Sequence, residues 1–129
     1  MPMLMPMSKA DTKILEKIFG GMESGTSKRI NNSDVYMYLS AERLSDNLYS
    51  MAHYFESNGD LCPDPDIELL RSKDGKWYPI ALQQSTGHYT RAIEDYNEDG
   101  PTKAYPRRYA DLRGFLSQWL KNVKDQQGL

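Results

Sequence analysis

The chain is poor in the residues that small proteins use for covalent or metal-based reinforcement. Among its 129 residues there is one cysteine, Cys62, and there are two histidines. A single cysteine excludes an internal disulfide, which fits a reducing compartment. A domain of this length can bury enough apolar surface to fold without disulfides or bound metal. We therefore expect one folded domain that needs no cofactor.

Long apolar runs and an excess of one charge are also missing. No apolar run approaches the roughly 18 residues that a membrane-spanning helix needs, so no membrane partner is expected. The opening MPMLMPMSK lacks the basic start and cleavage site of a signal peptide, and its prolines disfavour a helix. The net charge of −2 gives no overall field for nucleic acid or anionic membrane. These absences predict a cytoplasmic protein with a loose, disordered tail over residues 1–8.

Two amphipathic patterns predict helices at the two ends of the domain. The first begins near Lys9, with Ser8 or Asp11 as its N-cap, and stops at Gly20-Gly21. Its apolar stripe consists of Ile14, Leu15, Ile18, Phe19 and Met22. The stripe of the last helix consists of Tyr109, Leu112, Phe115, Leu116, Trp119, Leu120 and Val123. Such stripes are typical of helices that cover a sheet.

Between these helices, alternating patterns predict a sheet. We expect strands at residues 34–42, 48–56, 67–72, 76–84 and 89–94. Turns are expected at Asn58-Gly59 and at Asp74-Gly75, and the second turn is the strongest hairpin signal in the chain. Short connections favour antiparallel neighbours. The fold is therefore predicted as α+β: a single antiparallel sheet of four to five strands covered by both helices, over residues 9–125, with residues 126–129 as a tail.

Prolines and polar residues predict where this sheet is interrupted. Pro79 requires either an edge strand or a bulge. Pro63 and Pro65 are expected to keep the acidic stretch 63–66 outside the sheet, as a rigid loop. Residues 22–33 and 95–106 are rich in polar and turn-forming residues, so both are expected to be exposed loops.

One segment resembles a known family. The sequence H-Y-F-E-S-N-G-D-L-C-P-D-P runs from His53 to Pro65, and W-Y-P-I follows at Trp77 to Ile80. The pattern H-Y-x-x-x-N-G-D-x-x-x-D-P with a later W-x-P resembles an uncharacterised family of small proteins carried on plasmids, phages and integrative elements. The resemblance covers about the central third of the chain. It implies an accessory protein, of the adaptor, regulatory or anti-defence kind, and no catalytic mechanism.

The family pattern is not followed everywhere. The chain departs from it at Cys62 and in the acidic stretch after Glu94. Separately, F-L-S-Q-W-L at Phe115 to Leu120 resembles the C-terminal helix of another small bacterial family of unknown role. Cys62 has no second cysteine nearby and no nucleophile signature around it, so it is interpreted as an ordinary loop thiol.

Acidic residues give two candidate metal sites. Asp95, Asn97 and Asp99 match the first half of a calcium loop, in which oxygens at alternate positions converge on a hard cation, but Pro106 stands where the bidentate Glu should be. The second candidate is an acidic cluster near His53, formed by Glu56, Asp60, Asp64 and Asp66. A metal or acid–base role for this cluster competes with its interpretation as a solvated loop, and His53 reads as a half-buried sheet residue.

The start of the last helix gives a candidate contact surface. Lys103, Arg107, Arg108 and Arg113 are interleaved there with Tyr105 and Tyr109. Clustered cations contact phosphates, aromatic rings stack on bases, and both are enriched at protein-binding hot spots. Nearby acidic residues favour the alternative of a solvated, mixed-charge face.

These observations predict a small, soluble, non-enzymatic accessory or interaction protein with a protein partner. A nucleic-acid-contacting regulator is the first alternative, and a metal-assisted hydrolase that uses the acidic loop is the second. The predicted contact residues are Tyr105, Arg107, Arg108, Tyr109, Asp60 and Asp64. No catalytic residue is predicted, and the sequence does not determine an oligomeric state.

Overall fold

The described residues form two helices and eight strands. The computed structural model describes residues 4–33 and 37–129, without the side chains of residues 55–57 and 60–64. Helix α1 (Lys9–Phe19) comes first and helix α2 (Pro106–Gln127) last. The strands between them are β1 (Thr26–Ile30), β2 (Leu39–Arg43), β3 (Leu48–Ser57), β4 (Asp60–Arg71), β5 (Trp77–Gln83), β6 (Tyr89–Arg91), β7 (Ile93–Asn97) and β8 (Gly100–Ala104).

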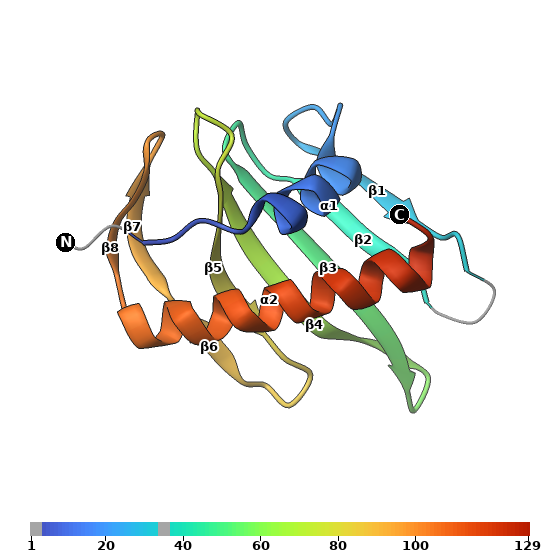
Figure 1. The fold of residues 1–129 in the computed structure, drawn as a ribbon. Helices are drawn as coiled ribbons and strands as arrows, with labels where there is room; N and C mark the ends of the chain where they lie inside the picture. Colours follow the sequence, from blue (N-terminus) through green and yellow to red (C-terminus); the bar gives the residue numbers. More distant parts are fainter. Residues whose placement is uncertain (1–3, 34–36) are drawn as a thin grey trace.

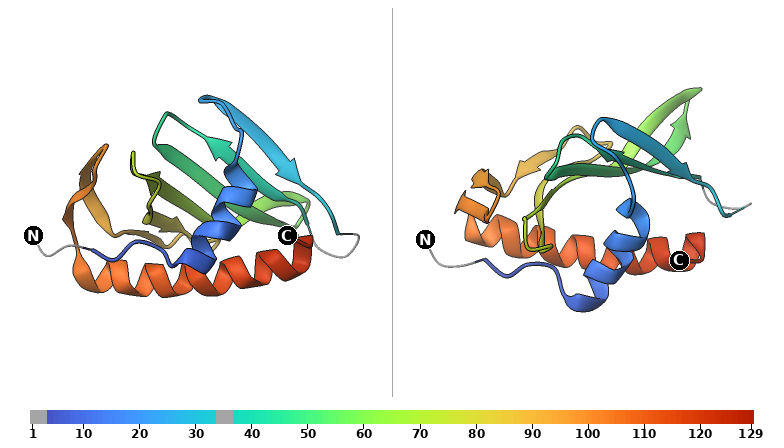
Figure 2. Two further views of the ribbon diagram at one scale, coloured as in Figure 1. Left: turned by 45° about the horizontal axis from the view of Figure 1, so that its top comes forward. Right: turned by 90° about the horizontal axis from the view of Figure 1, so that it is seen from above.

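The first six strands form one antiparallel sheet in the order in which they occur in the chain, and β7 and β8 form a separate hairpin. The α+β class is as predicted, but the main sheet has six strands and not four to five. Both helices lie on the same side of this sheet, and α2 crosses it from β7 and β8 toward β1 (Figures 1 and 2). The core lies between the helices and the sheet, where Leu15, Ile67 and Leu116 are fully buried.

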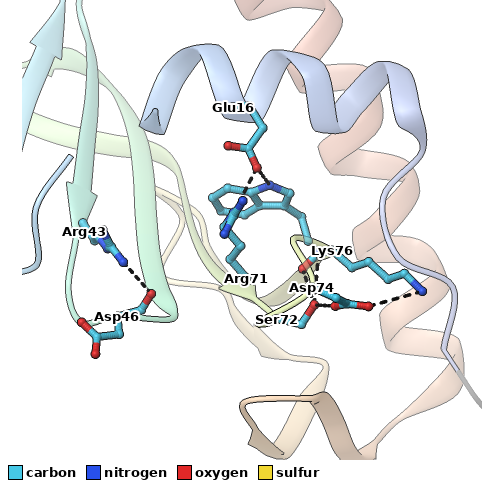
Figure 3. Close-up of polar contacts among 8 residues, drawn as sticks. Glu16, Arg43, Asp46, Arg71, Ser72, Asp74 and Lys76 are labelled. Atoms are coloured by element: carbon cyan, nitrogen blue, oxygen red, sulfur yellow. Dashed lines mark hydrogen bonds and ion pairs between the residues drawn. The ribbon is translucent and has the colours of Figure 1, made fainter. Parts of the chain in front are cut away.

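Helix α1 follows its local signals. The Ser8 hydroxyl accepts a hydrogen bond from the Asp11 N–H at 3.1 Å, and the Gly20 N–H reaches the Glu16 carbonyl at 2.8 Å. The predicted N-cap and stop are thus confirmed. Glu16 then joins α1 to the sheet, because its Oε1 accepts from Arg71 Nε and from Trp77 Nε1, both at 3.0 Å (Figure 3).

Two segments predicted as loops are in fact paired strands. Residues 22–33 contain β1, which pairs with β2, and residues 95–106 contain most of the β7–β8 hairpin. The predicted strand at 89–94 is divided by Ala92 into β6 and β7. These predictions were wrong because strand formation here depends on a partner strand and not on the apolar alternation of the segment itself.

The acidic stretch 63–66 is also part of the sheet, which contradicts its predicted exclusion. Strand β4 runs through both prolines and pairs with β3, and Pro63 lies opposite Tyr54. Pairing with β5 begins only at Asp66, and the β3–β4 register shifts between Ala52 and Tyr54. A proline fits such a two-stranded part because its missing N–H can face the side without a partner strand.

Other strand features agree with the sequence. The Asn58-Gly59 turn has positive φ at both residues (53° and 87°), and the hairpin at Asp74-Gly75 joins β4 to β5. Pro79 lies at a bulge, as predicted, because the register shifts between its partner Leu69 and Glu68. Strand β2 begins at Leu39, so it is shorter than the predicted strand 34–42, of which residues 34–36 lie outside the described residues.

The ends of the described chain pack against the domain. Met7 is buried, and its N–H donates to the Trp77 carbonyl at 2.8 Å. At the other end α2 continues to Gln127, whose buried Oε1 accepts from the Asn32 N–H at 2.8 Å. Residues 4–8 and 126–127 are therefore held by the domain, whereas the sequence led us to expect tails.

Candidate functional site

The residues predicted as a contact surface lie at the start of α2, but they do not form one surface. Tyr105, Arg107 and Arg108 are exposed. Tyr109 is only 3% exposed, and its hydroxyl donates to the Met5 carbonyl. Burial raises the pKa of the Tyr109 hydroxyl far above its ordinary value. Tyr109 is thus a core residue, and its predicted place among the contact residues was wrong.

The exposed residues at this helix start contact one another and the neighbouring strands. The Arg108 guanidinium lies 4.3 Å from the centre of the Tyr105 ring, and its Nη1 donates to the Arg91 carbonyl at 3.4 Å. The Tyr105 hydroxyl donates to Glu94 Oε2 at 3.2 Å. Of the other predicted cations, Arg113 is turned toward the N-terminal segment, where its Nε donates to the Pro6 carbonyl at 3.0 Å.

A hollow of about 230 Å³ lies beside this cluster, between α2 and the ends of β5 and β6. We call it the α2 groove, and its lining residues are Leu82, Thr90, Arg108, Asp111, Leu112 and Phe115. Leu82 and Thr90 are register partners on neighbouring strands. Phe115 was predicted to belong to the buried stripe of α2, yet it is 37% exposed. The groove therefore offers an apolar wall with one cation and one carboxylate at its border.

No sequence pattern indicates that this groove is a site. Phe115 belongs to an apolar stripe that was expected to be covered, and Leu82 falls within the predicted strand 76–84. Phe115 remains partly exposed because it lies at the margin of the α2 stripe, next to the edge strand β6 rather than over the middle of the sheet. Only the relative position of α2 and the sheet edge exposes an aromatic side chain there.

A second, polar hollow lies where three turns meet. Its volume is about 340 Å³, and it is lined by Asp46, Asn47, Arg71, Ser72, Lys73 and Glu98. Figure 3 shows Asp46, Arg71 and Ser72 from this lining. Its two cations already have partners, because Arg71 pairs with Glu16 at 3.0 Å and Lys73 pairs with Asp99 at 2.8 Å. These pairs neutralise the charges that would otherwise attract a ligand.

The candidate calcium residues belong to the β7–β8 hairpin. Asn97 Oδ1 accepts from the Asp99 N–H at 2.8 Å, which stabilises the turn, and Asp99 pairs with Lys73. Asp60 and Asp64 lie in β4, with side chains outside the description. Within the described part of the chain, no group of three or more His, Cys, Asp or Glu side chains is placed to hold a metal ion.

The opposite face of the main sheet carries tyrosines and carboxylates, and no described helix lies over it (Figure 2). We call this surface the acid–tyrosine face, and its residues are Arg29, Tyr38, Glu42, Tyr54, Asp66 and Glu68. The rings of Tyr38 and Tyr54 are 5.9 Å apart, and the Arg29 guanidinium lies 4.4 Å from the centre of the Tyr38 ring. Partial burial, followed by repulsion from Glu68 and Glu42, raises the pKa of Asp66 above 3.8.

His53 lies on the covered face of the sheet, as the sequence indicated. Its Nδ1 accepts from Trp119 Nε1 at 3.4 Å, while its buried Nε2 has no hydrogen-bond partner among the described residues. Burial lowers the pKa of His53 below 6.5. His88 is exposed, and the Cys62 side chain lies outside the described part of the structure.

The fold and these surfaces define a small α+β protein whose two helices share one side of an antiparallel sheet. The chain belongs to the family described as a domain of unknown function (DUF6908), whose model matches residues 10–129. This membership agrees with the expectation of an uncharacterised family. No curated protein and no solved structure matches the chain significantly. No helix among the described residues is long and apolar enough to cross a membrane.

Proposed function

We propose that this protein is a non-enzymatic interaction protein of the cytoplasm that binds a protein partner through the α2 groove. The observation that carries the proposal is an apolar hollow with a partly exposed aromatic side chain, Phe115, beside exposed arginine and tyrosine. Aromatic residues and arginine are enriched at the centres of protein interfaces. A partner side chain of apolar character fills the groove, and Arg108 and Asp111 supply polar contacts at its border.

The proposal includes the finer context implied by the sequence resemblance. We infer an accessory protein, of the regulatory or anti-defence kind, that is encoded on plasmids, phages or integrative elements. If so, genes for members of the family should lie mainly among genes for conjugation, integration or phage assembly. A random distribution of these genes over chromosomes would contradict the context without affecting the groove.

The test uses the full chain as bait in an extract of its native host. Phe115→Ala should remove a protein that the wild-type chain captures, and with that protein purified the Kd should rise about tenfold or more, because buried aromatic anchors are typical hot spots. Gln118→Ala, also exposed on α2, is the matched control and should capture the partner normally. A folded Phe115→Ala variant with wild-type affinity would refute the groove as the binding surface.

A second pair of variants examines the helix start. Arg107→Ala with Arg108→Ala should weaken partner binding and leave folding nearly unchanged, since both side chains are exposed and exposed charged contacts contribute little to stability. Full partner binding by this double variant would restrict the interface to the apolar wall of the groove.

Contact with nucleic acid is the alternative, and one observation favours it. Helix α2 has no side-chain N-cap and no acidic residue in its first turn, so its positive end faces the exposed Arg107 and Arg108. If this end binds phosphates, the double arginine variant should flatten the log–log salt dependence of affinity by about one unit per lost contact. Nuclease treatment that leaves the captured protein bound to the bait would contradict this alternative.

The metal-assisted hydrolase has less support. It depends on Asp60 and Asp64, whose side chains are outside the description, and Asp66 lies on the acid–tyrosine face without a described metal-binding group. If addition of a divalent ion shifted the NMR signals of Asp60, Asp64 and Asp66, this result would support the metal-assisted hydrolase.

A further inference from the structure

The acid–tyrosine face is arranged in two regular rows across the sheet. One row joins Arg29, Ser40, Ala52, Asp66 and Gln83, and the next joins Ser27, Glu42, Ser50, Glu68 and Ala81. Asp66 and Glu68 are therefore two residues apart on one strand, and their side chains share a face. Glu42 lies in the same row as Glu68, with Ser50 between them. Tyr38, just before β2, and Tyr54 on β3 lie two residues beyond Ser40 and Ala52 of the first row, and their rings are 5.9 Å apart.

The three carboxylates of this face, Glu42, Asp66 and Glu68, form no ion pair within the described part of the structure. Two cations lie at the ends of the rows. The Arg29 guanidinium lies over the Tyr38 ring. Arg91, the register partner of Ala81, donates from Nη2 to the Glu94 carbonyl at 3.3 Å and also interacts electrostatically with Glu68. The carboxylates repel one another, which contributes to the raised pKa of Asp66.

The chemistry of this face favours a cationic occupant. The Arg29–Tyr38 contact shows that the face already holds a guanidinium on a tyrosine ring, and such contacts strengthen as water is excluded. An extended peptide presents alternate side chains about 7 Å apart, which matches the spacing of Asp66 and Glu68 along β4. Phosphates would meet three carboxylates, so the same face disfavours nucleic acid.

We propose that the acid–tyrosine face binds an extended protein segment with arginine or lysine at alternate positions. The cations of the segment lie against Asp66 and Glu68. This surface is on the opposite side of the sheet from the α2 groove. It therefore goes beyond the proposed function and gives the protein a second, independent contact surface.

The test is an NMR titration of the full chain with short synthetic peptides. A peptide of alternating arginine and serine should shift the amide signals of β2, β3 and β4, and the shifts should weaken at high salt. A peptide with glutamate in place of arginine and a short single-stranded DNA should leave these signals unchanged. Absence of shifts with the arginine peptide, or equal shifts with the DNA, would overturn the proposal.

Two double variants with the same change in net charge separate local binding from general attraction. Asp66→Asn with Glu68→Gln should raise the Kd for the arginine peptide about tenfold, because both contacting charges are lost. Asp95→Asn with Asp125→Asn, which changes exposed carboxylates on β7 and α2, should leave the Kd within about twofold. Equal weakening in both variants would reduce the binding to net charge and overturn the proposal.

Binding at the acid–tyrosine face can be tested independently of binding at the α2 groove. Phe115→Ala should bind the arginine peptide normally, because Phe115 lies on the other side of the sheet. Loss of the native partner with retained peptide binding would support both surfaces, whereas no peptide binding by the wild-type chain would remove only the acid–tyrosine face.

Discussion

Two neighbouring rows of cross-strand residues lie one residue apart along each strand of the main sheet, so their side chains lie on opposite faces of the sheet. The covered row consists of Ala41, Met51, Ile67 and Leu82, and the open row consists of Glu42, Ser50, Glu68 and Ala81. In the covered row, Ala41, Met51 and Ile67 are at most 1% exposed. In the open row, Glu42 is exposed and Ser50 and Glu68 are half-buried, whereas Ala81 on β5 is buried. On β2, β3 and β4, alternation along the strand thus separates a buried apolar face from a more exposed polar face within a single sheet.

The comparison also shows what each face contributes. Burial of apolar side chains between the helices and the sheet is the main source of stability. The open face instead keeps repelling carboxylates near one another, which costs some stability at neutral pH. A cation bound beside these carboxylates would relieve their mutual repulsion. The open face is therefore suited to the recognition of a cationic partner.

The largest expected effect comes from the covered face. Leu116 in α2 is fully buried, so Leu116→Ala should lower the free energy of unfolding by about 2–5 kcal/mol. Lys121→Ala, on the exposed side of the same helix, should change it by less than about 0.5 kcal/mol. Urea denaturation monitored by circular dichroism measures both. Similar midpoints for the two variants would contradict the assignment of the core.

A smaller loss is expected where α1 meets the sheet. Glu16→Ala leaves the Trp77 indole N–H without its acceptor in a residue that is fully buried. An unsatisfied buried donor costs about 1–3 kcal/mol, which should appear as a lower urea midpoint. Lys17→Ala, its exposed neighbour in α1, serves as the control. A wild-type midpoint for Glu16→Ala would mean that water replaces the carboxylate.

The pH dependence of stability should be visible on the covered face. Because burial lowers the pKa of His53 below 6.5, the unfolded chain takes up the proton at a higher pH than the folded protein. The free energy of unfolding should therefore be unaffected well above pH 6.5 and should fall as the pH decreases below it. Urea midpoints at neutral and mildly acidic pH measure this change. His53→Gln should make it smaller, and an identical pH profile would contradict the role of His53.

The smallest effect is expected on the open face, and its sign is opposite. The pKa of Asp66 is raised, so the folded protein takes up the proton first and stability increases as the pH falls through that pKa. Asp66→Asn should leave the free energy of unfolding unchanged or raise it by at most about 0.5 kcal/mol, since solvent screens this half-buried group. Asp95→Asn is the control. A clear destabilisation by Asp66→Asn would show that the carboxylate has a structural partner.

Local signals in the sequence determined several parts of this protein by themselves. The Ser8 cap and the Gly20 stop define α1, the apolar stripe defines α2, and Asp74-Gly75 defines the β4–β5 hairpin. The bulge at Pro79 follows from the missing N–H of proline. In each of these cases the physical cause lies within a few residues of the feature, so neighbouring residues are enough to predict it.

Tertiary structure decided the rest, because the cause lies far away in the chain. Strand β1 exists through its pairing with β2, and both prolines of β4 fit the sheet because β5 leaves that part of the strand without a second neighbour. Tyr109 is buried and contacts the N-terminal segment, which is more than a hundred residues away in the chain. Phe115 is partly exposed because α2 crosses the edge of the sheet at this position. Composition and residue spacing do not determine contacts between residues that are far apart in the sequence. Both proposed binding surfaces could therefore be identified only from the folded structure.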